Sequence, residues 1–267
     1  MEPISFVIPL ILISLIAISM GALFLASRVT DIPLPHVVIE SSAGPAQALA
    51  IVFSGANGWV KFDQKLAEML SSSRFDVIGV DCLRYFFLKK KNPNVLAQDI
   101  SRVMEEWLGR QPVNREVIVV GNAKGADVAP FAVNRLEPRL RSQIQLVSLL
   151  GVARLATFRI STGELLQGGR GGPYPMQVSP EIRKLEGISG ICIYGDKDRV
   201  SLCRNLKRVP TMDIQEIKGG PYFHDAEPIF DIILKKYHER NLPSENQSVT
   251  ATPKEVPQES LMRDSQV

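Results

Sequence analysis

The stretch "VIVVGNAKGADVAP", residues 117–130, carries the strongest fold signal in the chain. Four branched apolar residues lead into "GNAKG" at 121–125, and a helix-like segment follows. This pattern has the shape of a nucleophile elbow, G-x-S-x-G, in which a sharp strand-to-helix turn lifts a serine above a sheet. The middle residue here is Ala123, which has no nucleophile. Taken alone, the pattern also fits an ordinary tight turn between a strand and a helix.

Five short apolar runs include or surround this turn and predict buried strands. They cover residues 48–55, 75–81, 116–122, 144–151 and 188–195. Helical patterns lie at 60–73, 94–110, 127–136 and 227–240, and residues 211–220 alternate like an edge strand. Strands that alternate with helices predict the α/β class, with a mostly parallel sheet covered by helices on both faces.

The two ends of the chain differ from this core. Residues 3–27 hold no charged side chain, and the 23 residues 4–26 would span roughly 35 Å as a helix, enough to cross a bilayer. We expect residues 1–28 to be a transmembrane anchor rather than a cleaved signal peptide, because "MEP" lacks basic residues. Residues 29–47 are then a linker, residues 48–241 the globular domain, and residues 242–267 a disordered tail rich in Pro, Ser, Gln and Glu.

Charge and cysteine content exclude some classes of function. A net charge of +3 that is spread along the chain does not predict nucleic-acid binding. Cys192 and Cys203 are close enough in the chain to form a disulfide, which would imply an oxidising compartment. No cysteine spacing matches a zinc site, so we expect neither a metal nor a cofactor. Cys82 is either a small buried residue at a strand end or an accessible thiol.

Functional groups of such sheets gather beyond the carboxyl ends of the strands. At the elbow, the backbone N–H of Lys124 would point at an anion, and Gly125 would let the helix pack close to its strand. The loop around Gly55 and Ala56 would supply a second donor. Both donors are backbone N–H groups, so a chain without the serine can still bind an anion at this place.

Acid and base candidates follow the later strands. Asp196 and Asp198 come after residues 188–195, where a triad acid would stand, although acids are also common in such loops. His224 follows the last predicted strand, but only after Pro221-Tyr222-Phe223. A lone histidine at this place is also typical of the start of a helix.

Residues 84–91, "RYFFLKKK", place aromatic side chains beside cations. Such a segment is typical of proteins that contact a membrane surface. The alternative, which we favour, is a partly buried aromatic run followed by a solvated basic loop.

Six motifs occur in order between Ala48 and Tyr237. They are "FSGANGW" (53–59), "GVDCLRYFF" (79–87), "GNAKGADVAPFAVNRL" (121–136), "SLLG" (148–151), "CIYGDKDRVSLC" (192–203) and "GGPYF" (219–223). Together they resemble the VirJ/AcvB family of bacterial virulence proteins, in which four of them read S-G-D-G-G-W, V-D-S-L-R-Y-F-W, G-Y-S-x-G-A-D-V-L-P-F and G-G-H-H-F. The resemblance implies an α/β-hydrolase fold on the periplasmic side of the bacterial inner membrane.

The resemblance also implies where a catalytic triad would stand, and this chain departs from the family at most of those positions. The elbow serine is replaced by Ala123, and the histidine position falls on Pro221 or Tyr222. The acid remains as Asp198, with Asp196 as the second choice. Because nucleophile and base are both missing, one engineered Ser→Ala change does not explain the pattern, and the serine mechanism should be silent. Ala56 and Cys82 replace a family aspartate and serine.

Some family members act in hydrolysis of lysyl-phosphatidylglycerol, and others are linked to type IV secretion of virulence DNA. We therefore expect a non-catalytic protein in the inner membrane, with its domain in the periplasm. It would bind an anionic phospholipid headgroup, or a secretion or envelope protein, through Gly55, Ala56, Lys124 and Gly125. The alternative is an ester hydrolase of aminoacylated phosphatidylglycerol, in which His224 acts as base and Cys82 or a metal-bound water replaces the serine. A third interpretation is a structural component of an envelope machine whose surface, rather than its pocket, is used.

Overall fold

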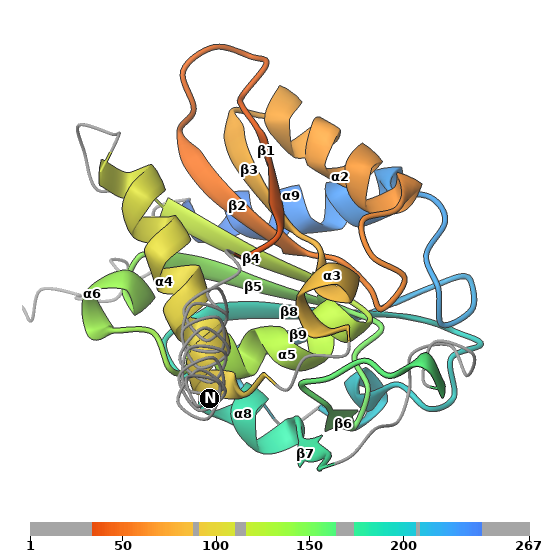
Figure 1. Cartoon of the computed structure of the whole chain (residues 1–267). Helices are drawn as coiled ribbons and strands as arrows, with labels where there is room; N and C mark the ends of the chain where they lie inside the picture. Colours follow the sequence, from red (N-terminus) through yellow and green to blue (C-terminus); the bar gives the residue numbers. More distant parts are fainter. Residues whose placement is uncertain (1–33, 88–90, 110–115, 164–173, 207–208, 242–267) are drawn as a thin grey trace, which may run out of the picture.

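A computed structural model describes residues 34–87, 91–109, 116–163, 174–206 and 209–241 (Figure 1). Its main feature is a 7-stranded sheet with the strand order β1-β3-β2-β4-β5-β8-β9. The strands are β1 (His36–Ile39), β2 (Ala48–Phe53), β3 (Phe75–Val80), β4 (Glu116–Asn122), β5 (Ile144–Leu150), β8 (Ser189–Gly195) and β9 (Met212–Ile217). All neighbours pair in parallel except β1, which is antiparallel to β3. A small antiparallel pair, β6 (Leu155–Ala156) and β7 (Met176–Gln177), follows β5.

Helices cover both faces of the sheet, as the alternating pattern predicts. Figure 1 shows α2 (Lys61–Ser72) and α9 (Glu227–Asn241) on one side, with α4 (Pro93–Gly109) and α5 (Lys124–Val133) on the other. An apolar core fills each side. The shorter helices are α3 (Cys82–Phe86), α6 (Pro138–Arg141), α8 (Ser179–Arg183) and the 3₁₀ turn η1 (Leu202–Asn205).

Burial explains why the sequence pattern located these elements. All six residues of β2 are buried, as expected for a parallel strand that is covered on both faces. Helix α4 buries Leu96, Ile100, Met104 and Trp107, which recur at the spacing of one helical face. The alternating residues 212–217 form β9, which lies at the edge of the sheet as predicted.

The predicted linker needs one correction, because its residues 36–39 form the edge strand β1. Three of these four residues are exposed and the fourth is half-buried, so no buried apolar run marks the strand. The predicted anchor, residues 1–28, and the predicted tail, residues 242–267, lie outside the described residues. Within the part of the chain that the structure describes, no helix is long and apolar enough to cross a membrane.

The aromatic run that precedes the basic loop is buried. Tyr85 and Phe86 lie in α3 with 1% and 0% of their surface exposed, and their rings meet edge to face. The Tyr85 hydroxyl donates to Asp99 at 2.5 Å, and Lys91 lies over the Tyr85 ring. The structure thus confirms the partly buried aromatic run, whereas residues 88–90 of the basic loop lie outside the described ranges.

Candidate functional site

The elbow backbone is present although its serine is not. Ala123 has φ 47° and ψ −107°, a region that costs a non-glycine residue about 1–3 kcal/mol and is typical of functional turns. The Ala123 N–H donates to the Leu150 carbonyl at 2.8 Å, and the Gly125 N–H donates to the Ser54 carbonyl at 3.1 Å. These bonds tie the elbow to the ends of β5 and β2, so the fold holds the strained turn without a nucleophile.

Close packing requires the two glycines of the elbow. A Cβ on Gly121 would lie 2.6 Å from backbone atoms of Ala126, and one on Gly125 would lie 2.3 Å from the Phe53 carbonyl oxygen. Both distances are far below van der Waals contact, and the atoms that would be struck are rigid backbone. The glycines let α5 approach its own strand and β2, as an elbow requires.

A cavity of about 630 Å³ opens beside the elbow at the carboxyl ends of the strands. Its wall brings together six residues that the sequence analysis selects as candidates: Gly55, Ala56, Ala123, Lys124, Tyr222 and His224. The remaining lining residues are Asn57, Gly58, Val60, Lys61, Phe62, Lys65, Asn122, Asp127, Gly151, Ala153, Phe223, Asp225, Ala226 and Glu227. Gly125, Asp196, Asp198 and Pro221 are not among the residues that line it.

The acid position holds a buried carboxyl group with one unused oxygen. Asp198 is 2% exposed, and its Oδ1 accepts from the Val200 N–H at 3.2 Å. Its Oδ2 is buried and accepts no hydrogen bond from the described residues. A buried polar atom without a partner costs about 1–3 kcal/mol, and in a serine hydrolase a histidine N–H satisfies the triad acid. Asp196 is exposed and accepts from the Gly219 N–H, so Asp198 is the better acid candidate.

The loop at the histidine position contacts both the acid loop and the elbow region. A Cβ on Gly195, at the end of β8, would lie 2.2 Å from the Gly220 carbonyl oxygen. A Cβ on Gly151, just after β5, would lie 3.2 Å from the Pro221 carbonyl oxygen. The neighbouring Leu150 carbonyl accepts the hydrogen bond from the Ala123 N–H. The nucleophile, acid and histidine positions therefore lie at the same edge of the sheet.

The Lys124 side chain does not point freely into the cavity. It is only 4% exposed, and its Nζ donates to Thr157 Oγ1. The sequence analysis names Lys124 as a binding residue and gives its backbone N–H as a donor at the elbow. Because the Lys124 ammonium group already bonds Thr157, we keep only the backbone N–H of Lys124 as a binding group for the ligand.

Charged side chains that the sequence analysis did not select line the cavity. Lys61 and Lys65 are exposed on the first turns of α2. Asp225 and Glu227 are exposed at the start of α9. The cavity therefore presents cations from one helix and anions from another. Nothing in the local sequence marks these residues, because their position depends on both helices beginning at the same edge of the sheet.

Cys82 cannot replace the missing serine. It is fully buried, and burial raises the pKa of its thiol far above the usual range. The thiolate is the nucleophilic form, so this cysteine is unreactive near neutral pH. A metal-bound water lacks support as well, since no cluster of His, Cys, Asp or Glu in the described ranges could hold a metal ion.

Asp63 is a buried acid behind the elbow that sequence reasoning missed. It is 0% exposed, and its carboxylate accepts from the Asn122 side chain at 2.9 Å and from the Val60 N–H at 3.1 Å. Burial raises the pKa of Asp63 from 3.8 to about 6, against the lowering effect of these hydrogen bonds. Asn122 lines the cavity, so Asp63 fixes the side chain next to Ala123.

Asp63 should make the folded chain less stable as the pH rises from 4 to 6. Over this range the unfolded chain has lost the Asp63 proton and the folded chain still holds it. The contribution of Asp63 to the free energy of unfolding therefore falls by about 2 kcal/mol. Urea unfolding at several pH values would measure the loss. The Asp63→Asn variant should not show this loss. An equal fall in the free energy of unfolding with pH in the variant and the wild type would contradict the raised pKa of Asp63.

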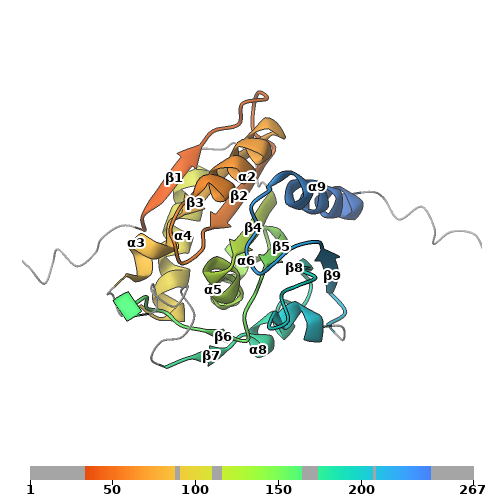
Figure 2. The same ribbon diagram turned by 90° about the vertical axis from the view of Figure 1, so that its right-hand side faces the viewer.

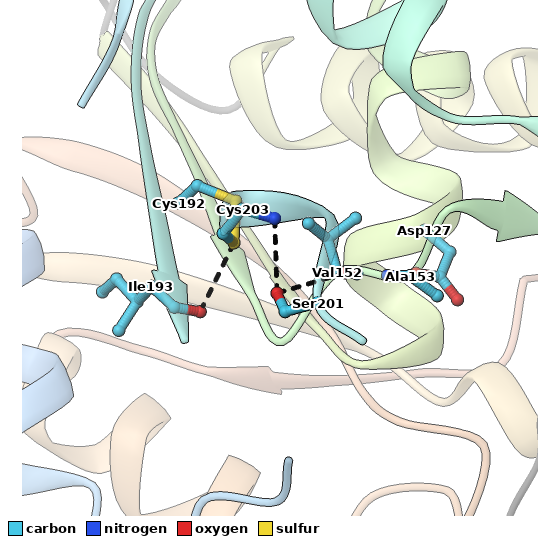
Figure 3. Close-up of a disulfide and its surroundings, with 7 residues drawn as sticks. All are labelled: Asp127, Val152, Ala153, Cys192, Ile193, Ser201 and Cys203. Carbon is cyan, nitrogen blue, oxygen red and sulfur yellow. Dashed lines mark hydrogen bonds between the residues drawn. A yellow bond between two sulfur atoms is a disulfide. The ribbon is translucent and has the colours of Figure 1, made fainter. Parts of the chain in front are cut away.

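A disulfide joins Cys192 in β8 to Cys203 in η1, with 5.6 Å between their Cα atoms (Figure 3). The Ser201 hydroxyl accepts from the Cys203 N–H, and Ser201 Oγ lies 3.5 Å from the Val152 carbonyl. The bridge closes the segment that carries Asp196 and Asp198. It therefore fixes the acid loop to the sheet.

Removing this disulfide should lower the stability of the folded domain. We expect the double change Cys192→Ser and Cys203→Ser to lower the free energy of unfolding by about 2–3 kcal/mol, as for loss of a short native disulfide. Thermal unfolding would measure the loss. A reducing agent should destabilise the wild type by a similar amount and leave the double variant unchanged. Equal sensitivity of both proteins would contradict this role.

Solved structures of α/β-hydrolase enzymes share this fold. Est1E from Butyrivibrio proteoclasticus is similar over 77% of this chain and 93% of its own, with a TM-score of 0.57 and 13% identity. MenH from S. aureus (TM-score 0.55, 10% identity) covers 78% of this chain and 99% of its own. A monoacylglycerol lipase from Paleococcus ferrophilus (TM-score 0.55, 12% identity) has the same two coverages. At these identities the likeness shows the fold alone.

Sequence comparison identifies the family. No curated protein shows a significant match to the chain. The sequence model of the bacterial virulence protein VirJ matches residues 47–241, which is nearly the globular domain that the sequence analysis predicts. The chain, with its α/β-hydrolase fold and an elbow that carries Ala123, therefore belongs to the VirJ family.

Proposed function

We propose that this chain is a membrane-anchored, periplasm-facing member of the VirJ family that binds a phospholipid headgroup and does not hydrolyse it. One observation carries this proposal: the elbow keeps its strained backbone and close packing around Ala123, which has no nucleophile. A fold that maintains about 1–3 kcal/mol of strain at this turn is consistent with selection for its shape rather than for its chemistry.

Backbone amides and cations would hold the phosphate. A Cβ on Gly55 would lie 3.8 Å from Ala123 Cβ, so the loop after β2 adjoins the elbow as it does around an oxyanion hole. The exposed Lys61 and Lys65 add positive charge to this wall. Asp225 and Glu227 supply negative charge from α9. This combination suits a headgroup that carries both a phosphate and an ammonium, as aminoacylated phosphatidylglycerol does.

Two observations support the proposed location. The Cys192–Cys203 disulfide is typical of proteins in oxidising compartments, which in bacteria include the periplasm. The uncharged residues 3–27 are long enough to anchor the chain in the inner membrane. A secretion-system or envelope protein that presents an anionic segment would use the same amides and lysines, and it remains the competing ligand.

Binding can be measured with a short-chain aminoacylated phosphatidylglycerol kept below its micelle concentration. Titration calorimetry on the full chain should show saturable binding, and Lys65→Gln should weaken it about fivefold, as expected for loss of about 1 kcal/mol. Lys235→Gln is the matched control, since Lys235 is 78% exposed on α9 and absent from the cavity wall. Equal affinity of all three proteins, or no binding, would contradict the proposed ligand.

The alternative is hydrolysis with relocated residues, and the position of His224 favours it. This histidine is exposed and lines the cavity that contains Ala123. A fluorophosphonate probe tests for any activated serine or similar nucleophile. We expect no labelling, whereas labelling that disappears in His224→Ala would support the alternative.

A further inference from the structure

The chain enters the domain at the edge of the sheet that holds the cavity. Strand β1 runs antiparallel to β3, so its first residue, His36, pairs with Val80 at the carboxyl end of β3. Leu34 is already buried at 4% exposure, and the Pro35 carbonyl accepts from the Asp81 N–H at 3.0 Å. The segments after β2 and β3, which begin α2 and α3, lie toward the right in Figure 1 and face the viewer in Figure 2.

Few residues separate this entry point from the apolar segment. The apolar run ends at Ala26, and the seven residues 27–33 precede Leu34. Fully extended, seven residues span at most about 25 Å. The opposite edge of the sheet is farther away by roughly 20 Å, the length of a six-residue strand. A membrane that held the apolar segment could therefore lie against the carboxyl edge with residues 27–33 in any compact arrangement, but against the amino edge only with these residues almost fully extended.

The loops at this edge expose apolar side chains together with cations. After β5, β8 and β9 respectively, Leu155 is 50% exposed, Val200 57% and Tyr222 49%. Exposed cations accompany them, including Lys61, Lys65, Arg154 and Arg199, beside the exposed acids Asp196, Asp225 and Glu227. Apolar and aromatic side chains among lysines and arginines are typical of surfaces that lie in the headgroup region of anionic bilayers.

We propose that the carboxyl edge of the sheet lies against the bilayer in which the N-terminal apolar segment is anchored. This inference rests on the proposed membrane anchor, and it adds the orientation of the domain. The cavity then adjoins the lipid headgroups, and a headgroup reaches the elbow without its lipid leaving the membrane. The amino edge, at the starts of the parallel strands, faces away from the bilayer.

Site-directed fluorescence on the full chain tests this orientation. The chain is reconstituted into vesicles of phosphatidylcholine and phosphatidylglycerol, and bimane is attached to a cysteine that replaces Leu155 or Val200. Glu186→Cys and Ser72→Cys are the matched controls, because both residues are exposed at the amino edge. The native cysteines do not compete for the label, since two form the disulfide and Cys82 is buried.

Lipids with a headgroup nitroxide should quench the carboxyl-edge labels about threefold or more strongly than the controls, because the controls lie roughly 20 Å farther from the bilayer. Equal quenching at the two edges, in a chain that floats with the vesicles, would overturn the orientation and leave the anchor intact. A chain that does not float with the vesicles would overturn the anchor, and the orientation with it. The two failures are thus distinguished in one preparation.

Discussion

A chain that carries both Ala123→Ser and Pro221→His is expected to hydrolyse aminoacylated phosphatidylglycerol at least about 10²-fold faster than the wild type. The elbow already holds residue 123 in the backbone conformation of a nucleophile. The Oδ2 of Asp198 is buried and accepts no hydrogen bond from the described residues, as expected where a histidine N–H is missing. Chromatographic measurement of the released amino acid gives the rate.

The two single changes are the controls for this restoration. Ala123→Ser alone lacks a base at the triad position and Pro221→His alone lacks a nucleophile, so neither should exceed the wild type appreciably. Adding Asp198→Asn to the double variant should remove most of the gained activity, because the histidine would lose its orienting acid. Tyr222→His in place of Pro221→His tests the second candidate position. If neither double variant gains activity, the acid loop and the elbow do not form a disarmed triad.

Replacing Gly125 with alanine is expected to lower the free energy of unfolding by about 3 kcal/mol or more. The new methyl group would lie 2.3 Å from the Phe53 carbonyl oxygen, and neither β2 nor α5 can move without disrupting the sheet. Urea unfolding followed by circular dichroism would measure the loss. Gly109→Ala is the matched control, since a Cβ at the end of α4 meets no atom within 4 Å. A stable Gly125→Ala variant would contradict the elbow packing.

The sequence predicted most of the sheet because its strands are buried on both faces. Such strands are nearly continuous apolar runs, and the predicted residues 116–122 coincide with β4. The elbow could also be predicted, because Gly121 and Gly125 stand two residues before and two residues after Ala123, and this spacing at the end of a strand has a specific packing reason. Strand β1 was missed because its side chains are mostly exposed and the segment around it is rich in proline, serine and glycine.

The cavity wall was predicted less completely because it depends on contacts between distant segments. Asp63 lies 59 residues before Asn122, and only the packing of α2 against β2 and β3, next to β4 in the sheet, brings them together. Lys65 and Asp225 line one cavity because α2 and α9 both begin at the carboxyl edge. The direction of the Lys124 side chain could not be predicted either, since its partner Thr157 lies beyond β5.

The central claim is that the site binds a lipid headgroup and does not hydrolyse it. The most direct test is the rate at which the unmodified full chain hydrolyses lysyl-phosphatidylglycerol in vesicles. Release of lysine is measured with the chain present and with empty vesicles as the reference. We predict equal rates, because Ala123 supplies no nucleophile, Cys82 is buried and Pro221 supplies no base. A rate well above the reference, which scales with the amount of chain, would contradict the account.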